Sequence, residues 1–338
     1  MIQRIAKRIG EQQEKNPKQF ILAFIILILI TIPGIPFLIG NVEASLEQVL
    51  PEHVESVETM NHARTHYSAD MVHIVLYAQG AITDIRQAQD FAYEIQQRLE
   101  GKPKITHVEA TLDTTRTNDA KTIGVIDIQA NTGTDTANIQ EVLHTIQEAI
   151  TYAEHTNPGV HTQITGFAAI DQATFSTIMS DFLRITAIAM TLILTILYAL
   201  FRTIRNTLVP MAVVMVALIA TMGITGYLGI TITVVTMVAA AMILGLGIDF
   251  GIHTIHSYSE YRKKKTPPEA MKYTVEELFR AQLAASLTTS AGFLALGLGV
   301  LPAMANLGIV LAIGILLTFL ASTLLLPPLL LLTEKTTT

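Results

Sequence analysis

The chain alternates between long runs that hold no charged residue and shorter polar segments. The uncharged runs are Phe20–Gly40, Ile185–Phe201, Thr207–Ile248 and Ala281–Thr333. A helix that crosses a membrane needs about 20 apolar residues. The first two runs fit one span each. The last two, of 42 and 53 residues, fit two spans each if the chain turns within Gly226–Gly229 and Leu301–Asn306. The pattern therefore predicts six transmembrane helices.

Buried core helices of a soluble protein are the alternative, but they rarely continue for about 40 residues without a charge. Only 15% of the residues are charged, against about 25% in soluble domains. The first run is too long for the apolar region of a cleaved signal peptide, which is typically about 7–15 residues, so we expect a retained span. The chain has no cysteine, and therefore no disulfide can brace any part of it.

Between the first two spans the periodicity changes from helical runs to alternating short elements. Four segments are rich in apolar and β-branched residues and predict strands: Met71–Gln79, Lys104–Thr111, Thr122–Ala130 and Val160–Thr165. Two segments have apolar residues at helical spacing: Thr83–Glu100 and Thr136–Glu154. The order β-α-β-β-α-β is that of a ferredoxin-like fold. Leu50–Ser68 and Ala168–Ser180 are predicted to add flanking helices.

The predicted fold class is an α-helical membrane protein with one α+β ferredoxin-like domain outside the membrane, between spans one and two. Its parts are a cytoplasmic amphipathic segment (1–18), the first span (19–40), the extracytoplasmic domain (41–181), spans two to six (182–333) with a cytoplasmic linker helix (260–280), and a cytoplasmic tail (334–338).

The distribution of charge sets the expected orientation. Basic residues cluster before the first span, between spans two and three, and between spans four and five, as in Lys263–Lys265. With six spans these three segments share one side, which the positive-inside rule makes cytoplasmic. Residues 41–181 carry 20 acidic and 7 basic residues. We therefore expect a protein of the cell membrane with both termini in the cytoplasm. The acidic balance of residues 41–181 argues against a nucleic-acid partner.

Asp249 is the one carboxylate within a predicted span. A charged Asp at the bilayer centre costs roughly 2.5–3.5 kcal/mol, and such residues usually mark an ion or proton pathway. His253 follows one helical turn later, and a histidine can share a proton with a carboxylate because it titrates near neutrality. His256 lies a further turn along, where the simpler reading is a solvated residue at the membrane interface.

Small and hydroxyl residues surround this carboxylate in the predicted helices. Gly245, Gly247 and Gly251 reduce side-chain bulk beside it, which lets a neighbouring helix approach closely. The hydroxyls of Thr288, Thr289 and Ser290 in the fifth span can bond to Asp249 or to water. They can equally bond back to carbonyls of their own helix.

The segment GLGIDFGIHTIHSYSEYR resembles the fourth-span motif of the resistance–nodulation–division (RND) transporter superfamily. TTSAGFLAL, LPAMANLGIVLAIG and TLLLPPLLLL are similar to the fifth and sixth spans of its hydrophobe and amphiphile exporters, the MMPL-type branch. The resemblance implies a porter-like outer domain and a proton-relay role for Asp249. Usual members carry two copies of this unit and twelve spans. One copy is present here, so either two chains pair or the protein works differently, and we expect a homodimer.

The expected function is secondary active, proton-coupled export of a lipid-like or hydrophobic substrate. One alternative is a SecD/SecF-like auxiliary subunit of protein export, and another is a non-transporting sensor or scaffold similar to sterol-sensing proteins. We expect no enzymatic activity and no cofactor. His62 and His66 are spaced as a metal pair could be, but two histidines alone do not make a metal site.

Overall fold

The computed structural model describes residues 2–41, 70–77, 85–112, 122–130, 136–157, 160–233 and 235–335. They fall into two compact units. The α/β unit comprises Ala44–Thr177, and the helical unit comprises Met1–Glu43 with Ile178–Thr338. The predicted helix at Leu50–Ser68 and the pair His62 and His66 lie outside the described residues.

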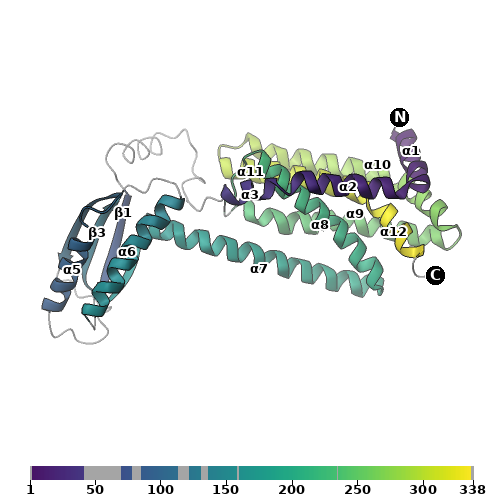
Figure 1. The fold of residues 1–338 in the computed structure, drawn as a ribbon. Coiled ribbons are helices and arrows are strands. Elements are labelled where there is room, and N and C mark those ends of the chain that lie inside the picture. Colours follow the sequence, from purple (N-terminus) through teal and green to yellow (C-terminus); the bar gives the residue numbers. More distant parts are fainter. Residues whose placement is uncertain are drawn as a thin grey trace. The chain divides into compact units, whose positions relative to one another are not determined.

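The α/β unit is built on a four-stranded antiparallel sheet in the order β2-β3-β1-β4. Its elements in chain order are β1 (Asp70–Tyr77), α5 (Ile85–Leu99), β2 (Ile105–Leu112), β3 (Thr122–Ala130), α6 (Thr136–Thr156) and β4 (His161–Gly166). The strand and helix bounds lie within two residues of those the periodicity predicts. Figure 1 shows α5 and α6 alongside the sheet.

The core of this unit follows from the register of the central strand pair. Val72 lies opposite Ile128 and Ile74 lies opposite Ile126, and all four side chains are fully buried. Because alternate residues of a strand share a face, these four line one face of the sheet. Apolar residues of α5 and α6 complete the same cluster, among them Phe91, Ile95, Leu99, Ile146 and Ile150.

The helical unit has six segments long and apolar enough to cross a membrane. They are Pro17–Gly40, Ser180–Phe201, Ile204–Tyr227, Thr236–Arg262, Pro267–Leu298 and Pro302–Glu334. The helices concerned are α2 (Pro17–Thr31), α3 (Gly34–Gly40), α7 (Phe167–Phe201), α8 (Ile204–Tyr227), α9 (Ala239–Arg262), α10 (Pro267–Leu294), α11 (Pro302–Leu324) and α12 (Leu326–Lys335). The prediction of six spans agrees with this count in the described part of the chain.

Glycines bring the C-terminal part of the first span against α8. An added Cβ at Gly226 would lie 1.9 Å from the carbonyl oxygen of Gly34, and one at Gly223 would lie 2.0 Å from that of Thr31. Only residues without a side chain permit this backbone-to-backbone contact. The first span itself is interrupted at Pro33, between α2 and α3.

The N-terminal helix α1 (Ile2–Lys15) packs against α10. Ala6 and Gln13 are each 1% exposed, and Glu11 pairs with Lys272 of α10 at 3.3 Å. The segment predicted to be amphipathic is therefore a helix, and its contact with α10 was not predicted from the sequence. Its buried face carries small residues such as Ala6 and Gly10, which suit helix–helix contact.

Three boundaries differ from the prediction. The linker helix at 260–280 is not a separate element: α9 ends at Arg262, and α10 starts at Pro267 and continues into the fifth span. Its start is fixed by a capping box in which Thr266 and Glu269 bond reciprocally. The break before the last span precedes Pro302, because proline at the first position begins a helix. The helix α12 includes Glu334, which was predicted to belong to a featureless tail.

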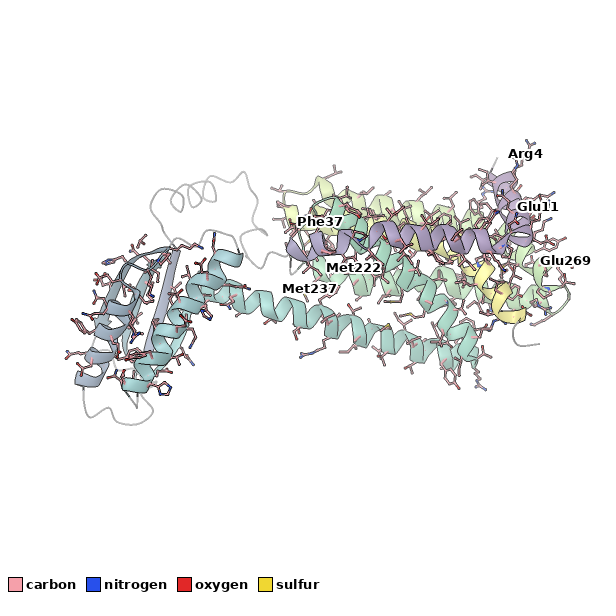
Figure 2. All side chains as sticks on the ribbon, in the orientation of Figure 1. Arg4, Glu11, Phe37, Met222, Met237 and Glu269 are labelled. Atoms are coloured by element: carbon pink, nitrogen blue, oxygen red, sulfur yellow. The ribbon has the colours of Figure 1, made fainter. Side chains whose placement is uncertain are left out.

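The helices α1 and α12, which begin and end the described part of the chain, lie at the same end of the helical unit (Figure 1). Figure 2 places Arg4, Glu11 and Glu269 at that end, whereas Phe37 lies at the opposite end. The charged and apolar ends of the bundle are thus separated along the direction of its helices.

Candidate functional site

Asp249 lies in an open pocket of about 360 Å³ between α9 and α10. The pocket is lined by Leu246, Asp249, Phe250 and His253 of α9, by Leu278, Ala281, Gln282, Ala285 and Thr289 of α10, and by Ile315 of α11. Helical spacing of four residues puts Asp249 and His253 on one face of α9. The structure thus brings these two together with Thr289.

Gln282 links α10 to α9 by hydrogen bonds beside this pocket. Its Nε2 donates to the main-chain carbonyl of Phe250 at 3.1 Å and to Thr254 Oγ1 at 3.2 Å. Thr254 Oγ1 in turn donates to the same Phe250 carbonyl at 2.8 Å. Gln282 and Thr254 are both buried. This network, one residue from Asp249, was not predicted from the sequence.

The three glycines near Asp249 differ in how closely other helices approach them. An added Cβ at Gly247 would lie 2.7 Å from Thr318 Cγ2 of α11, and one at Gly251 would lie 2.9 Å from Pro210 Cβ of α8. These two glycines therefore allow α9 to sit close to its neighbours. A Cβ at Gly245 would meet nothing within 4 Å, so this glycine lies on an open face.

The same open face carries the carboxylate. Gly245, Asp249 and His253 are all exposed in the single chain. Most of the adjoining exposed positions of α10 are small: Ala281, Ala284, Ala285, Thr288, Ala291 and Gly292. Two exposed leucines, Leu287 and Leu294, lie among them at 52% and 50% exposure. By contrast, the exposed face of α2 carries large apolar residues such as Leu29 and Ile30, at 64% and 61% exposure. The α9–α10 face, defined by the α9 and α10 residues named here, is therefore richer in small side chains than the exposed face of α2.

The three hydroxyl residues of α10 predicted to lie near Asp249 have different surroundings. Thr289 lines the Asp249 pocket. Thr288 Oγ1 bonds back to the carbonyls of Ala284 and Ala285, at 2.9 and 3.0 Å. Ser290 Oγ donates to the carbonyl of Ala312 in α11 at 3.2 Å. Only Thr289 among the three thus shares a pocket with Asp249, and a role in proton transfer for any of them stays a prediction.

Comparison with known proteins decides the family. The sequence profile of the MMPL family matches residues 46–336. This chain belongs to the MMPL family. The resemblance carried by the fourth-span motif is thereby confirmed.

Two relatives give the extent of the similarity. MJ1562 of Methanocaldococcus jannaschii is 28% identical over 373 aligned residues, which cover 99% of this chain and 95% of that protein. ActII-3 of Streptomyces coelicolor is 31% identical over 179 residues, which cover 51% of this chain and 25% of that protein.

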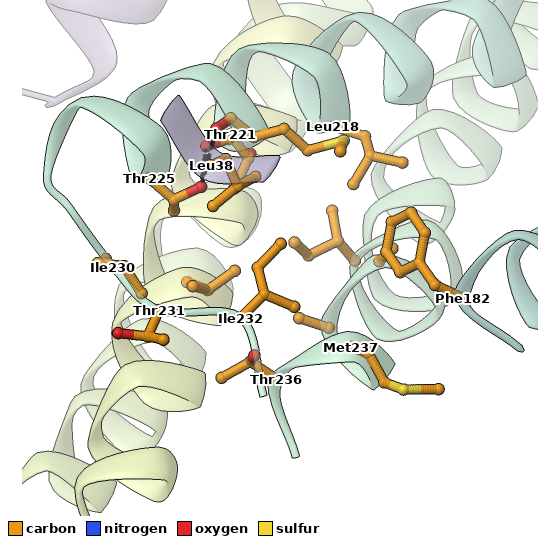
Figure 3. Close-up of a pocket in the computed structure, with 15 residues that line it drawn as sticks. Leu38, Phe182, Leu218, Thr221, Thr225, Ile230, Thr231, Ile232, Thr236 and Met237 are labelled. Atoms are coloured by element: carbon orange, nitrogen blue, oxygen red, sulfur yellow. Dashed lines mark hydrogen bonds between the residues drawn. The ribbon is translucent and has the colours of Figure 1, made fainter. Parts of the chain in front are cut away.

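A second, apolar pocket in this MMPL protein lies at the end of the helical unit that contains α3 (Figure 3). Its volume is about 40 Å³, and its walls include Leu38, Phe182, Leu218 and Met237. The hydroxyls of Thr221, Thr225 and Thr236 all donate to main-chain carbonyls of their own segments. The pocket therefore presents mainly methyl and methylene groups, which suit a hydrocarbon guest better than water.

The opposite end of the helical unit holds a cluster of charged and polar side chains around Glu334 of α12. Arg262 Nε and Nη2 donate to Glu334 Oε1 at 3.0 and 2.8 Å, and Arg205 Nη2 lies 3.8 Å from Oε2. Tyr258 also donates to Glu334. Glu334 thus joins the ends of α8, α9 and α12. The sequence signal was the presence of Glu334 at the end of the last span, together with Arg205 and Arg262 at the ends of two other spans.

In the α/β unit, an open groove of about 620 Å³ runs between α6 and the first turns of α7. Its lining combines Gln140, Gln147, Gln172 and His144 with apolar residues such as Leu143 and Ile164. Among the described residues of the chain, no group of three or more His, Asp or Glu side chains is arranged to hold a metal ion.

Proposed function

We propose that this MMPL protein is a secondary active transporter that exports lipid-like or hydrophobic substrates by letting protons in through Asp249. The observation that carries the proposal is the meeting of Asp249, His253 and Thr289 in one pocket between two spanning helices. A carboxylate at membrane depth is costly, and its usual purpose is transport of ions or protons. Protonation removes the charge, so the two protonation states of Asp249 differ strongly in their preferred surroundings.

Two features support a hydrophobic substrate. The pocket of Figure 3 offers methyl-lined walls to a hydrocarbon group. Membership of the MMPL family supports a transporter of the RND type. The electrical part of a proton gradient supplies about 2.3 kcal/mol per charge per 100 mV, which is enough to drive export against a concentration gradient.

The proposed working unit is a homodimer with twelve spans, in which the α9–α10 faces of two copies meet. Small side chains on this face allow close helix packing, and a two-fold axis brings the same surface of each copy to the contact. Such packing would remove Asp249 from lipid. It would also set the two Asp249 side chains near each other, where both cannot ionise cheaply.

The proposed location is the cell membrane, with both termini in the cytoplasm. The cluster of basic residues at the end of the bundle that holds the termini supports this orientation. The α/β unit, inserted between spans one and two, then lies outside. Its element order and the sheet order β2-β3-β1-β4 support a ferredoxin-like, porter-like domain.

Proton flux in liposomes tests the proposal. The purified protein is reconstituted with and without added acyl or isoprenoid lipids, and wild type is compared with Asp249→Asn. The amide keeps the shape of the side chain but cannot release a proton, so flux should fall to that of empty liposomes. Asp181→Asn, at the start of the second span, is the matched control and should retain wild-type flux.

The alternatives predict different results. An auxiliary subunit of protein export would conduct protons in a lipid-independent manner, and a sensor or scaffold would tolerate Asp249→Asn. Undiminished flux in Asp249→Asn would overturn the proton-relay role.

A further inference from the structure

Gln282 is an uncharged polar side chain held inside the membrane-spanning part of α10. It is 6% exposed, and it lies within the charge-free stretch from Ala281 onward. Burying an amide without hydrogen bonds costs roughly 1–3 kcal/mol by protein mutational data. Its hydrogen bonds therefore decide which way the side chain faces.

The bonds to α9 fix the orientation of the amide. Thr254 Oγ1 uses its own hydrogen on the carbonyl of Phe250, so it can only accept from Gln282. The Phe250 carbonyl can also only accept. Both atoms that Gln282 approaches thus require its NH₂ group, and the two N–H bonds are used there. The oxygen Oε1 is the polar atom of Gln282 that remains for the pocket.

That oxygen meets a restricted set of partners. Of the ten residues that line the pocket, Asp249 and His253 are the titratable ones. Beyond the lining, α9 adds His256, and α10 adds Arg280 and Glu277, the latter bonded to Ser257 Oγ at 2.9 Å. The helix α11 has no titratable residue. An amide oxygen accepts hydrogen bonds only, so it can pair with a protonated carboxyl, with an N–H of His253 or with water, and it opposes a carboxylate.

We propose that Gln282 is a positioning residue that favours the proton-loaded form of Asp249, with its Oε1 accepting a hydrogen bond from the carboxyl directly or through one water. The inference rests on the proposed function and extends it, since it assigns the group that retains the proton between uptake and release. Thr254 acts in the same arrangement by holding the amide with its oxygen toward the pocket.

Carbodiimide labelling tests this without any transport measurement, because carbodiimides react with protonated carboxyl groups. The fraction of Asp249 labelled in the purified protein is followed by mass spectrometry across pH, with Asp249→Asn as the blank. In Gln282→Leu the midpoint of labelling should move down by about one pH unit, as expected for loss of one hydrogen bond to the protonated form. Thr254→Val should move it in the same direction by less.

Two features keep the test decisive. Gln282→Leu leaves no donor unpaired, because Thr254 still bonds to Phe250, so the variant should fold. Ser286→Ala is the matched control: Ser286 is fully buried in the same helix, but its Oγ bonds to its own helix at Leu283, 2.9 Å away. Its midpoint should equal that of wild type.

The outcomes separate the two proposals. Coincident midpoints for wild type and Gln282→Leu would overturn the role of Gln282, even if proton flux depends on Asp249. A lowered midpoint together with flux that survives Asp249→Asn would support Gln282 as a positioning residue and reject the proton-relay function instead.

Discussion

Gln13 donates a hydrogen bond of 2.8 Å from Nε2 to the main-chain carbonyl of Thr323. In a regular helix that carbonyl would accept from the N–H of residue 327, but Pro327 has none. The amide of the N-terminal helix thus occupies the place that proline leaves open between α11 and α12. Residues more than 300 positions apart in the chain are joined at a helix break.

Replacing Gln13 by Ala should destabilise the helical unit by about 1–3 kcal/mol, because the buried carbonyl of Thr323 would lose its partner. Thermal unfolding in detergent measures this. Gln12→Ala is the matched control, since Gln12 is the exposed neighbour on the same helix, and it should change stability by less than about 0.5 kcal/mol. Equal effects of the two variants would contradict the role given to Gln13.

Gly226→Ala should separate α3 from α8. The added methyl group would lie 1.9 Å from the carbonyl oxygen of Gly34, and backbone cannot give way as a flexible side chain can. The expected loss is about 1–3 kcal/mol or more, seen as a lower unfolding temperature. Gly40→Ala, where a Cβ meets nothing within 4 Å, should be nearly neutral. A stable Gly226→Ala protein would mean that these helices are not in backbone contact.

The proposed homodimer predicts a specific cross-link. The chain has no cysteine, so Gly245→Cys introduces a single reactive site on the α9–α10 face. A short bis-maleimide should join two copies in native membranes. Leu29→Cys, on the exposed face of α2, should stay monomeric under the same conditions. If cysteines at Gly245 and throughout 245–251 give no dimer, and the mass in detergent is that of one chain, the paired arrangement should be abandoned.

The proposed orientation predicts that the two sides of the membrane give access to different parts of the chain. Cysteines introduced at Gln129, in β3, and at Lys264, between α9 and α10, should react with an impermeant maleimide from opposite sides of the membrane. Intact cells should label Gln129→Cys, and inverted vesicles should label Lys264→Cys. Labelling of both from one side would remove the six-span topology.

Glu334→Gln should weaken the joint between α8, α9 and α12. The carboxylate is half-buried and bonds to Arg262 twice, so we expect a loss of about 1 kcal/mol after allowing for partial solvent screening. Unfolding at low and high salt checks this. Glu260→Gln breaks the exposed pair with Lys263 and should leave the unfolding temperature unchanged. An equal, salt-sensitive shift in both variants would show that the Glu334 cluster is an ordinary surface pair.

The six apolar helices and the place of Asp249 within one of them were predictable because both are read from a single stretch of sequence. A long charge-free run has few interpretations, and a carboxylate within one is conspicuous. The break at Pro33 follows equally from local chemistry.

Other features depend on which residues of another helix contact a side chain, and the periodicity of the sequence does not predict such contacts. Gln282 and Gln13 look like ordinary polar residues until their partners, Phe250 and Thr323, are known. The linker at 260–280 was misread because a change from polar to apolar composition was taken as a helix boundary. In the structure α10 simply passes from one environment into the next. The surface under α1 was missed for the same reason, since an amphipathic helix fits a membrane and a protein groove alike.

The helix α10 continues without a break from the charged end of the bundle past the Asp249 pocket. Its 28 residues span about 42 Å at 1.5 Å per residue. Near one end it supports α1 through Lys272, and farther along it forms the wall of the Asp249 pocket. Because both contacts lie on one uninterrupted helix, a shift of α10 along its axis at the pocket would also displace its contact with α1, through the pair of Lys272 and Glu11.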